Sequence, residues 1–133
     1  MSIILYFSGF LAAALIQASV IYFAESLGFT SLGVALTINR LVWHILAGEV
    51  VGFAYLFLAR NSKMVQDWSV WIQGLVLGGI YWSIALPAGI ITGAIKSNAI
   101  LGMPTFLFTL TAFILYGLVT ASTIRNALFI WST

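Results

Sequence analysis

Three ionisable side chains lie inside one apolar stretch of this sequence, and their chemistry is what the rest of the chain has to accommodate. Arg40, His44 and Glu49 occur between Asn39 and Arg60, a run long and apolar enough to cross a bilayer. A charged side chain at the centre of a bilayer costs roughly 2.5–3.5 kcal/mol on insertion scales. We therefore expect the folded protein or a partner to compensate for these candidate buried ionisable or coupling residues.

Helical spacing separates the three side chains. At about 100° per residue, Arg40 and His44 share one stripe of the helix, whereas Glu49 lies on the opposite side from Arg40. The two charged residues cannot form a salt bridge within this helix. Arg40 is close to the end of the run, where its long side chain can extend to the interface, but Glu49 is close to the membrane midplane. Glu49 is the strongest functional candidate.

Each of the three residues has two interpretations. Arg40 is either an interfacial anchor or a partner for another subunit. His44 is either a neutral histidine hydrogen-bonded to a facing Ser, Thr or carbonyl group, or a haem or metal ligand, which would require a second chain because the sequence has one histidine. Glu49 is either a structural carboxyl, protonated or paired across an interface, or a group that handles a proton or cation. We predict no cofactor and no metal site in the chain itself.

The composition places these residues in a membrane protein. Of the 133 residues, 62% are hydrophobic and 6% are charged, whereas a typical soluble domain has about 25% charged residues. A small soluble fold could not bury so much apolar surface, so lipid must be the solvent. The net charge of +2 is not clustered as nucleic-acid binding requires. Cysteine is absent, which excludes disulfides and thiolate sites.

The apolar runs predict an all-α integral membrane protein with a single four-helix transmembrane domain over residues 1–133. The four spans are expected at about 3–24, 34–59, 68–95 and 103–127. The first run lacks a basic N-terminal region and is too long for the core of a signal peptide, which predicts a retained helix. Pro87 lies within the third run and is expected to kink that helix.

The charges of the loops predict the orientation of the spans. With four spans, the central loop lies on the same side as both termini. That side carries Arg60, Lys63 and Arg125, whereas the other side carries Lys96. Because cytoplasmic loops are enriched in Lys and Arg, we expect both termini to be cytoplasmic.

The two halves of the sequence resemble each other. Residues 31–52 align with residues 100–121, and Leu, Gly, Ile and Val coincide at seven positions. This pattern is typical of two tandem helical hairpins in a parallel repeat; convergent use of small and apolar residues is the alternative. In this alignment the positions of Arg40, His44 and Glu49 correspond to those of Thr109, Phe113 and Leu118. The three ionisable side chains therefore occur in the first half of the sequence and not in the second.

Glycine pairs indicate where the helices touch. Small residues four positions apart let membrane helices approach closely. The candidate pairs are Gly48 with Gly52, Gly74 with Gly78, and Gly89 with Gly93. Polar side chains within the spans are candidate hydrogen-bond partners at membrane depth, and these are Gln17, Gln73, Ser83, Thr92, Thr109 and Thr120.

Known catalytic signatures are missing from the sequence: it has no HExxH, phosphate-binding loop or GxSxG motif, and we predict that the chain is not an enzyme.

Residues 45–52 resemble the glutamate-bearing helix of small multidrug-resistance transporters, although here the glutamate belongs to the second span rather than the first. No function is carried over from this resemblance.

Two functional hypotheses follow from these observations. The first is an accessory or structural subunit that packs within a larger membrane complex and pairs Arg40, His44 or Glu49 with a neighbouring subunit. The second is a small homo-oligomeric transporter or channel that uses Glu49 for proton or cation coupling. The expected partners are the lipid bilayer and either other membrane subunits or further copies of the chain, with no nucleic acid.

Overall fold

A computed structural model of the chain describes residues 2–96 and 102–131, and the side chains of residues 3–96 and 102–127. Within these ranges the chain forms no strand and has five helices, namely α1 (Ser2–Ser26), α2 (Ile38–Asn61), α3 (Lys63–Asp67), α4 (Val70–Ile91) and α5 (Met103–Trp131). Four of them, α1, α2, α4 and α5, are long and apolar enough to cross a membrane. The predicted four-helix membrane bundle is therefore confirmed, and the chain is a small multi-pass membrane protein.

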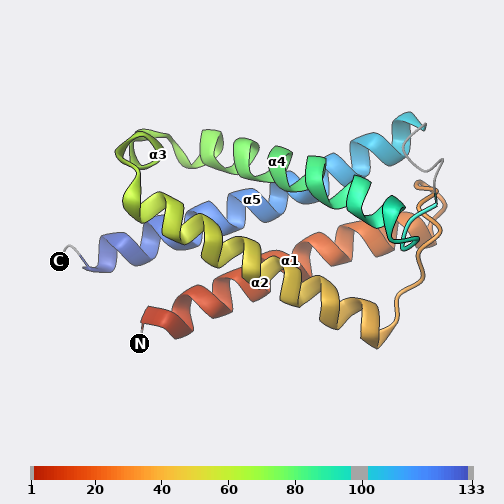
Figure 1. The fold of residues 1–133 in the computed structure, drawn as a ribbon, viewed down its shortest axis with the longest axis horizontal. Helices are drawn as coiled ribbons and strands as arrows, with labels where there is room; N and C mark the ends of the chain where they lie inside the picture. The colour runs from red at the N-terminus through yellow and green to blue at the C-terminus, as the bar shows by residue number, and fades with distance from the viewer. Residues whose placement is uncertain (1, 97–101, 132–133) are drawn as a thin grey trace.

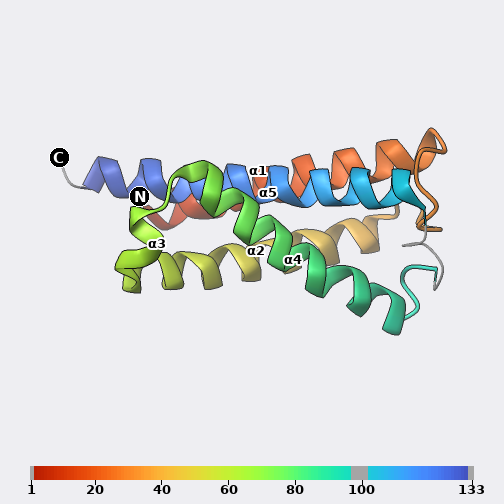
Figure 2. The same cartoon turned by 90° about the horizontal axis from the view of Figure 1, so that it is seen from above.

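The four spans alternate in direction along the sequence. The first turn of α1, the last turn of α5 and the short α3 lie at one end of the molecule, whereas residues 27–37 and 92–96 lie at the other end (Figures 1 and 2). We call these the α3 end and the connector end. Each span is one continuous helix, as expected in lipid, where a helix satisfies its backbone hydrogen bonds internally.

The second span begins later than the sequence predicted. Residues 34–37 were expected to be helical, but α2 begins at Ile38, after an extended segment. Thr37 has extended backbone angles, and its side chain accepts a hydrogen bond from the amide of Arg40 (3.2 Å), which caps the helix. Upstream, within the non-helical segment, Gly33 has a φ of 71°, a backbone conformation outside the helical region. Apolar composition alone does not distinguish this short extended segment from the helix that follows it.

The third span is shorter at both ends than the predicted range of 68–95. Ser69 caps α4 by accepting a hydrogen bond from the amide of Ile72 (3.3 Å). The helix continues through Pro87 and ends at Ile91. Gly93, with a φ of 76°, then turns the chain. The predicted kink at Pro87 stays a prediction.

The last helix, α5, is the centre of the bundle. It packs along α4 on one side and along α1 on the other, while α2 packs on α1. By contrast, α2 and α4 are joined near the α3 end by a hydrogen bond from Tyr55 to Gln73, and they diverge towards the connector end in the view of Figure 1. A two-fold repeat of hairpins would pair α2 with α4 as α1 pairs with α5. Along the described residues, no comparable α2–α4 packing occurs, so the contacts between the two hairpins are not symmetric.

Glycines lie at two of the helix contacts. A Cβ atom on Gly48 would lie 2.9 Å from that of Ala14, and a Cβ on Gly52 would meet the ring of Phe10, so both glycines face α1. Gly78 lies against the backbone of α5, where a Cβ atom would be 2.6 Å from Ile114 Cα, and Gly74 abuts Leu118 in the same contact. These close approaches replace the hydrophobic driving force that lipid does not supply.

The third predicted glycine pair has a different role from the one expected. Gly89 accommodates the side chain of Ile95, whose amide donates to the Gly89 carbonyl (3.0 Å). Gly93 has no described atom within 4 Å of the position that its Cβ would take, and it supplies the positive φ of the turn. Among the described residues, the pair therefore serves to end α4, and no helix–helix contact is seen at it, because both glycines lie where the chain leaves the helix.

We expect Gly78→Ala to destabilise the protein by about 1–3 kcal/mol, because the added methyl group would overlap the α5 backbone. The measurement is the free energy of unfolding in mixed detergent micelles. The adjacent Gly79→Ala is a matched control, since no described atom lies within 4 Å of its Cβ position. It should be neutral or stabilise the helix by up to about 1 kcal/mol. Equal effects of the two substitutions would contradict the close α4–α5 contact.

Candidate functional site

Arg40 and His44 lie on the face of α2 that borders a cavity. The Nη1 atom of Arg40 donates to the backbone carbonyl of Ala35 (3.1 Å), and the side chain is exposed. One turn later, His44 is half-buried beside the backbone of Ala14. Its Nε2 atom is enclosed and finds no hydrogen-bond partner in the described part of the chain. The stripe predicted from helical spacing thus presents both side chains to one space.

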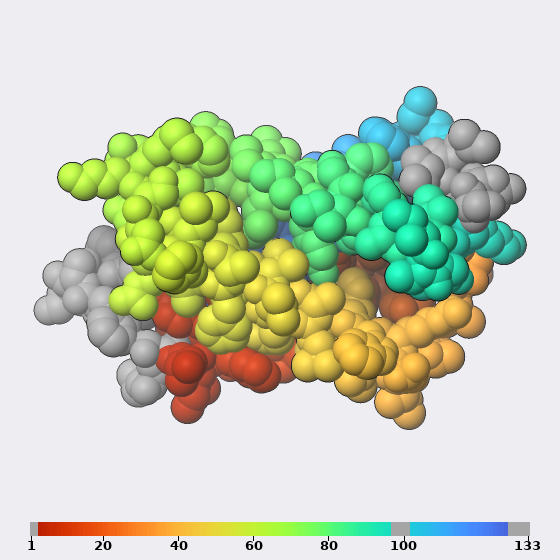
Figure 3. Space-filling view, in the orientation of Figure 1, coloured from red at the N-terminus to blue at the C-terminus, as the bar shows by residue number. Residues whose placement is uncertain are grey.

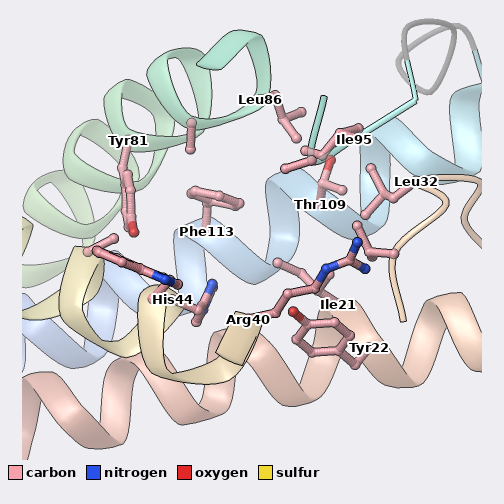
Figure 4. A pocket seen from close by; sticks show the side chains of 15 residues that line it. Ile21, Tyr22, Leu32, Arg40, His44, Tyr81, Leu86, Ile95, Thr109 and Phe113 are labelled. Carbon is pink, nitrogen blue, oxygen red and sulfur yellow. The ribbon is translucent and has the colours of Figure 1, made fainter. Parts of the chain in front are cut away.

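The cavity has a volume of about 530 Å³ and lies between α2 and α4 at the connector end. Its walls come from both diverging helices, and α1 and α5 close it from behind. The molecular surface is hollowed between α2 and α4 on the same side (Figure 3). Arg40 and Tyr22 lie at one end of the cavity, and the hydroxyl group of Tyr81 points towards α2, where His44 lies (Figure 4).

Glu49 is buried elsewhere in α2. Its side chain is 6% exposed, and it is not among the described residues that line the cavity. It is one residue from Gly48 and three residues from Gly52, which both abut α1. Both carboxyl oxygens are enclosed, and neither has a hydrogen-bond partner within residues 3–96 and 102–127. The Glu49 carboxyl is therefore enclosed without a hydrogen-bond partner among the described residues.

Tyr116 of α5 contacts the turn of α2 that carries this acid. Its side chain is fully buried, and its hydroxyl group donates to the backbone carbonyl of Gly48. This hydrogen bond ties α5 to α2 at the turn that carries the acid.

Two more buried polar side chains have no hydrogen-bond partners in the described part of the chain. Gln17 and Thr120 are fully buried, and no described group hydrogen-bonds to the Gln17 amide or the Thr120 hydroxyl. They follow Ala13 and Tyr116 by one helical turn, and both of those residues belong to the principal apolar cluster. Buried polar groups are normally paired with protein or water. The core therefore has unused hydrogen-bonding capacity on α1, α2 and α5.

The other polar candidates behave differently. Tyr55 donates to Gln73 Oε1 (2.9 Å), which joins α2 to α4 near the α3 end. Trp82 Nε1 donates to Thr109 (3.0 Å) and joins α4 to α5. By contrast, the hydroxyl groups of Ser83 and Thr92 donate to carbonyl groups of their own helix. Gln73 and Thr109 are thus the predicted polar residues that connect separate helices.

Glu25 has a structural role that the sequence did not indicate. Its carboxylate accepts hydrogen bonds from the Thr30 hydroxyl and from the amides of Leu32 (3.0 Å) and Gly33 (2.8 Å). It thereby fixes the connector that leads to α2 and to one end of the cavity. In the sequence, the one sign of this role is an acid at the end of a helix, followed by two glycines in the loop. Hydrophobic patterning does not show which backbone amides such a carboxylate will bind.

Metal binding has no cluster of ligands to support it. Within the described residues, no three His, Asp or Glu side chains gather in a group that could hold a metal ion.

The chain matches no protein-family model, no curated protein and no solved structure.

We expect Glu25→Ala to loosen the connector, because it removes a charged acceptor of hydrogen bonds that contribute about 1.5–3 kcal/mol each. Hydrogen exchange of the Leu32 and Gly33 amides should accelerate by at least about tenfold. The control is Asp67→Ala, which removes an exposed acid at the other end of the molecule. Unchanged exchange at both amides in Glu25→Ala would show that the carboxylate does not hold the connector.

Proposed function

We propose that this protein is a small homo-oligomeric membrane transporter or channel in which Glu49 binds the coupled proton or cation. The observation that carries the proposal is the enclosed carboxyl group, whose two oxygens find no hydrogen-bond partner among the described residues. An ionisable residue at membrane depth is typically functional because its presence there is costly. A protonation or cation-binding step at Glu49 would compensate for that cost.

The surroundings of Glu49 support this proposal over a purely external partner. A carboxyl that pairs with a neighbouring subunit has to reach the outer surface, but this one is enclosed by its own bundle. The buried Gln17 and Thr120 side chains offer further polar atoms in the bundle, and the Tyr116 hydroxyl donates to the backbone carbonyl of Gly48, the residue before the acid. The proposed transporter is a homo-oligomer because four helices rarely enclose a complete ion pathway on their own.

A second candidate function is an accessory or structural subunit within a larger membrane complex. Arg40 favours it, because its guanidinium group is exposed and is bonded to one backbone carbonyl, that of Ala35. A carboxylate of a neighbouring subunit could pair with the remaining N–H groups. The two candidates place the essential residue at opposite positions: inside the bundle for the transporter, and at the rim for the subunit.

We expect Glu49→Gln to abolish ion flux in proteoliposomes, because the amide cannot take up and release a proton or hold a cation as a carboxylate does. Proton flux is measured with a pH dye inside the liposomes, under an imposed membrane potential. Sodium flux is measured in the same way, with a sodium gradient imposed across the membrane. We expect at least a tenfold reduction, to the level of empty liposomes. Asp67→Asn is the matched control, since it neutralises an exposed acid outside the spans and should retain wild-type flux.

Wild-type flux equal to that of empty liposomes, with every driving ion, would overturn the transporter proposal. Native mass spectrometry after mild detergent extraction then distinguishes the second candidate. A stable assembly with other subunits, lost in Arg40→Gln, supports an accessory role, whereas a homo-oligomer supports the transporter.

We also propose that both termini and α3 face the cytoplasm. Arg60, Lys63 and Arg125 belong to that end by sequence, and cytoplasmic segments favour Lys and Arg. The cysteine-free chain permits a direct test. A membrane-impermeant maleimide applied from outside should label Leu27→Cys, at the connector end, in intact cells. It should label Met64→Cys, in α3, only after permeabilisation; both native side chains are exposed. The reverse pattern would invert the orientation.

A further inference from the structure

The cavity between α2 and α4 has the dimensions of a ligand site. Its volume of about 530 Å³ lies within the range of about 300–1,000 Å³ that small-molecule sites occupy. It exists because α2 packs on α1 and diverges from α4 towards the connector end (Figure 1). The hollow opens on the side of the bundle, between two membrane spans (Figure 3). A molecule in the bilayer can therefore approach it laterally.

The lining combines apolar walls with one cation. Most of the lining consists of aliphatic and aromatic side chains, including Trp43 and Ala47 of α2 and Ala85 of α4. Arg40 is the one formally charged residue among the described lining residues, and no described acid shares the cavity with it. The carboxylate of Glu25 accepts hydrogen bonds from the amides of Leu32 and Gly33 in the connector. The carboxyl group of Glu49 is enclosed and does not line the cavity. The charge of the cavity is thus complementary to an anion.

The guanidinium group has donors to spare. One N–H of Arg40 reaches the Ala35 carbonyl at 3.1 Å, while a guanidinium group has five N–H donors arranged to grip a carboxylate or phosphate in two places. Tyr22 lies at the same end of the cavity, and its hydroxyl adds a neutral donor there (Figure 4). Arg40 is also in the first turn of α2, where the helix dipole favours negative charge.

The direction of the cavity matches that of a lipid in a leaflet. Arg40 is at the connector end of its span, whereas Ala47 lies two helical turns, or about 10 Å, closer to the middle of the membrane. An acidic headgroup at Arg40 would therefore place an attached hydrocarbon chain between the apolar walls of α2 and α4. The polar end would stay at the membrane interface.

We propose that this cavity binds an anionic amphiphile, with its acidic headgroup on Arg40 and its hydrocarbon chain between α2 and α4. Two sources share this chemistry, namely a free fatty acid and an anionic phospholipid of the bilayer. The site is separate from Glu49, and the proposal does not depend on transport.

The test uses quenching of Trp43, which lines the cavity, by brominated acyl chains. The full-length protein in dodecyl maltoside is titrated with a dibrominated C18 fatty acid and with the corresponding alcohol, which has the same chain without the acid. We expect saturable quenching by the acid at least about tenfold tighter than by the alcohol. Trp43→Phe should remove most of the saturable signal. Equal binding of acid and alcohol would overturn the proposal.

Matched arginine variants then test the headgroup contact. Arg40→Gln should weaken binding of the acid by at least about tenfold, whereas Arg60→Gln, at the other end of the same helix and outside the cavity lining, should bind like wild type. Unchanged affinity in Arg40→Gln would contradict the assignment. If that variant does not fold, the comparison of acid with alcohol on the wild-type protein still decides the proposal.

Phospholipids with the same brominated chains identify the source. Tighter quenching by phosphatidylglycerol than by the fatty acid indicates a phospholipid site, and the opposite order indicates a fatty-acid site. Quenching by phosphatidylcholine as strong as that by phosphatidylglycerol, with weak binding of the acid, would overturn the need for an anionic headgroup.

Discussion

The close contact of α5 with α4 is the constraint from which the rest of the bundle follows. At this contact Gly74 and Gly78 of α4 lie against the α5 backbone, and Gly117 of α5 faces the Gly74 carbonyl. In lipid, apolar side chains gain little by leaving their solvent, so helices associate where their backbones can approach. With one side of α5 occupied by α4 and another by α1, α2 is left to pack on α1. The divergence of α2 from α4, and the cavity between them, are consequences of this arrangement.

The position of α2 is stabilised by polar contacts as well as by glycines. Tyr116 binds the Gly48 carbonyl from α5, and Tyr55 binds Gln73 of α4 near the α3 end. Both contacts hold the middle and the α3 end of α2. At the connector end the helix instead depends on its Thr37 cap and on the segment organised by Glu25. The part of α2 that carries Arg40 is therefore positioned by the connector.

Two chemically distinct regions result from this geometry. On one side, the carboxyl of Glu49 is enclosed, and Gln17 of α1 and Thr120 of α5 are likewise buried without partners among the described residues. The cavity between α2 and α4 instead offers Arg40 against apolar walls. A buried acid suits exchange of a small cation or a proton, whereas an accessible arginine beside a hydrocarbon-sized space suits an anionic amphiphile. One helix supplies the ionisable group to both regions, because its two sides face different neighbours.

The sequence by itself determined the lipid environment, the four spans and the separation of Arg40 from Glu49, since these follow from composition, run length and helical periodicity. It also identified Gly48, Gly52, Gly74 and Gly78 as small residues in pairs. Only the tertiary structure decided which neighbour each side of α2 meets, that residues 34–37 are extended, and that Gly89 and Gly93 end α4. The reason is physical: a helix in lipid is apolar all round, so hydrophobic periodicity does not mark its buried face. Whether the carboxyl groups of Glu49 and Glu25 are buried or hydrogen-bonded depends on contacts with other segments, and local sequence does not encode these contacts.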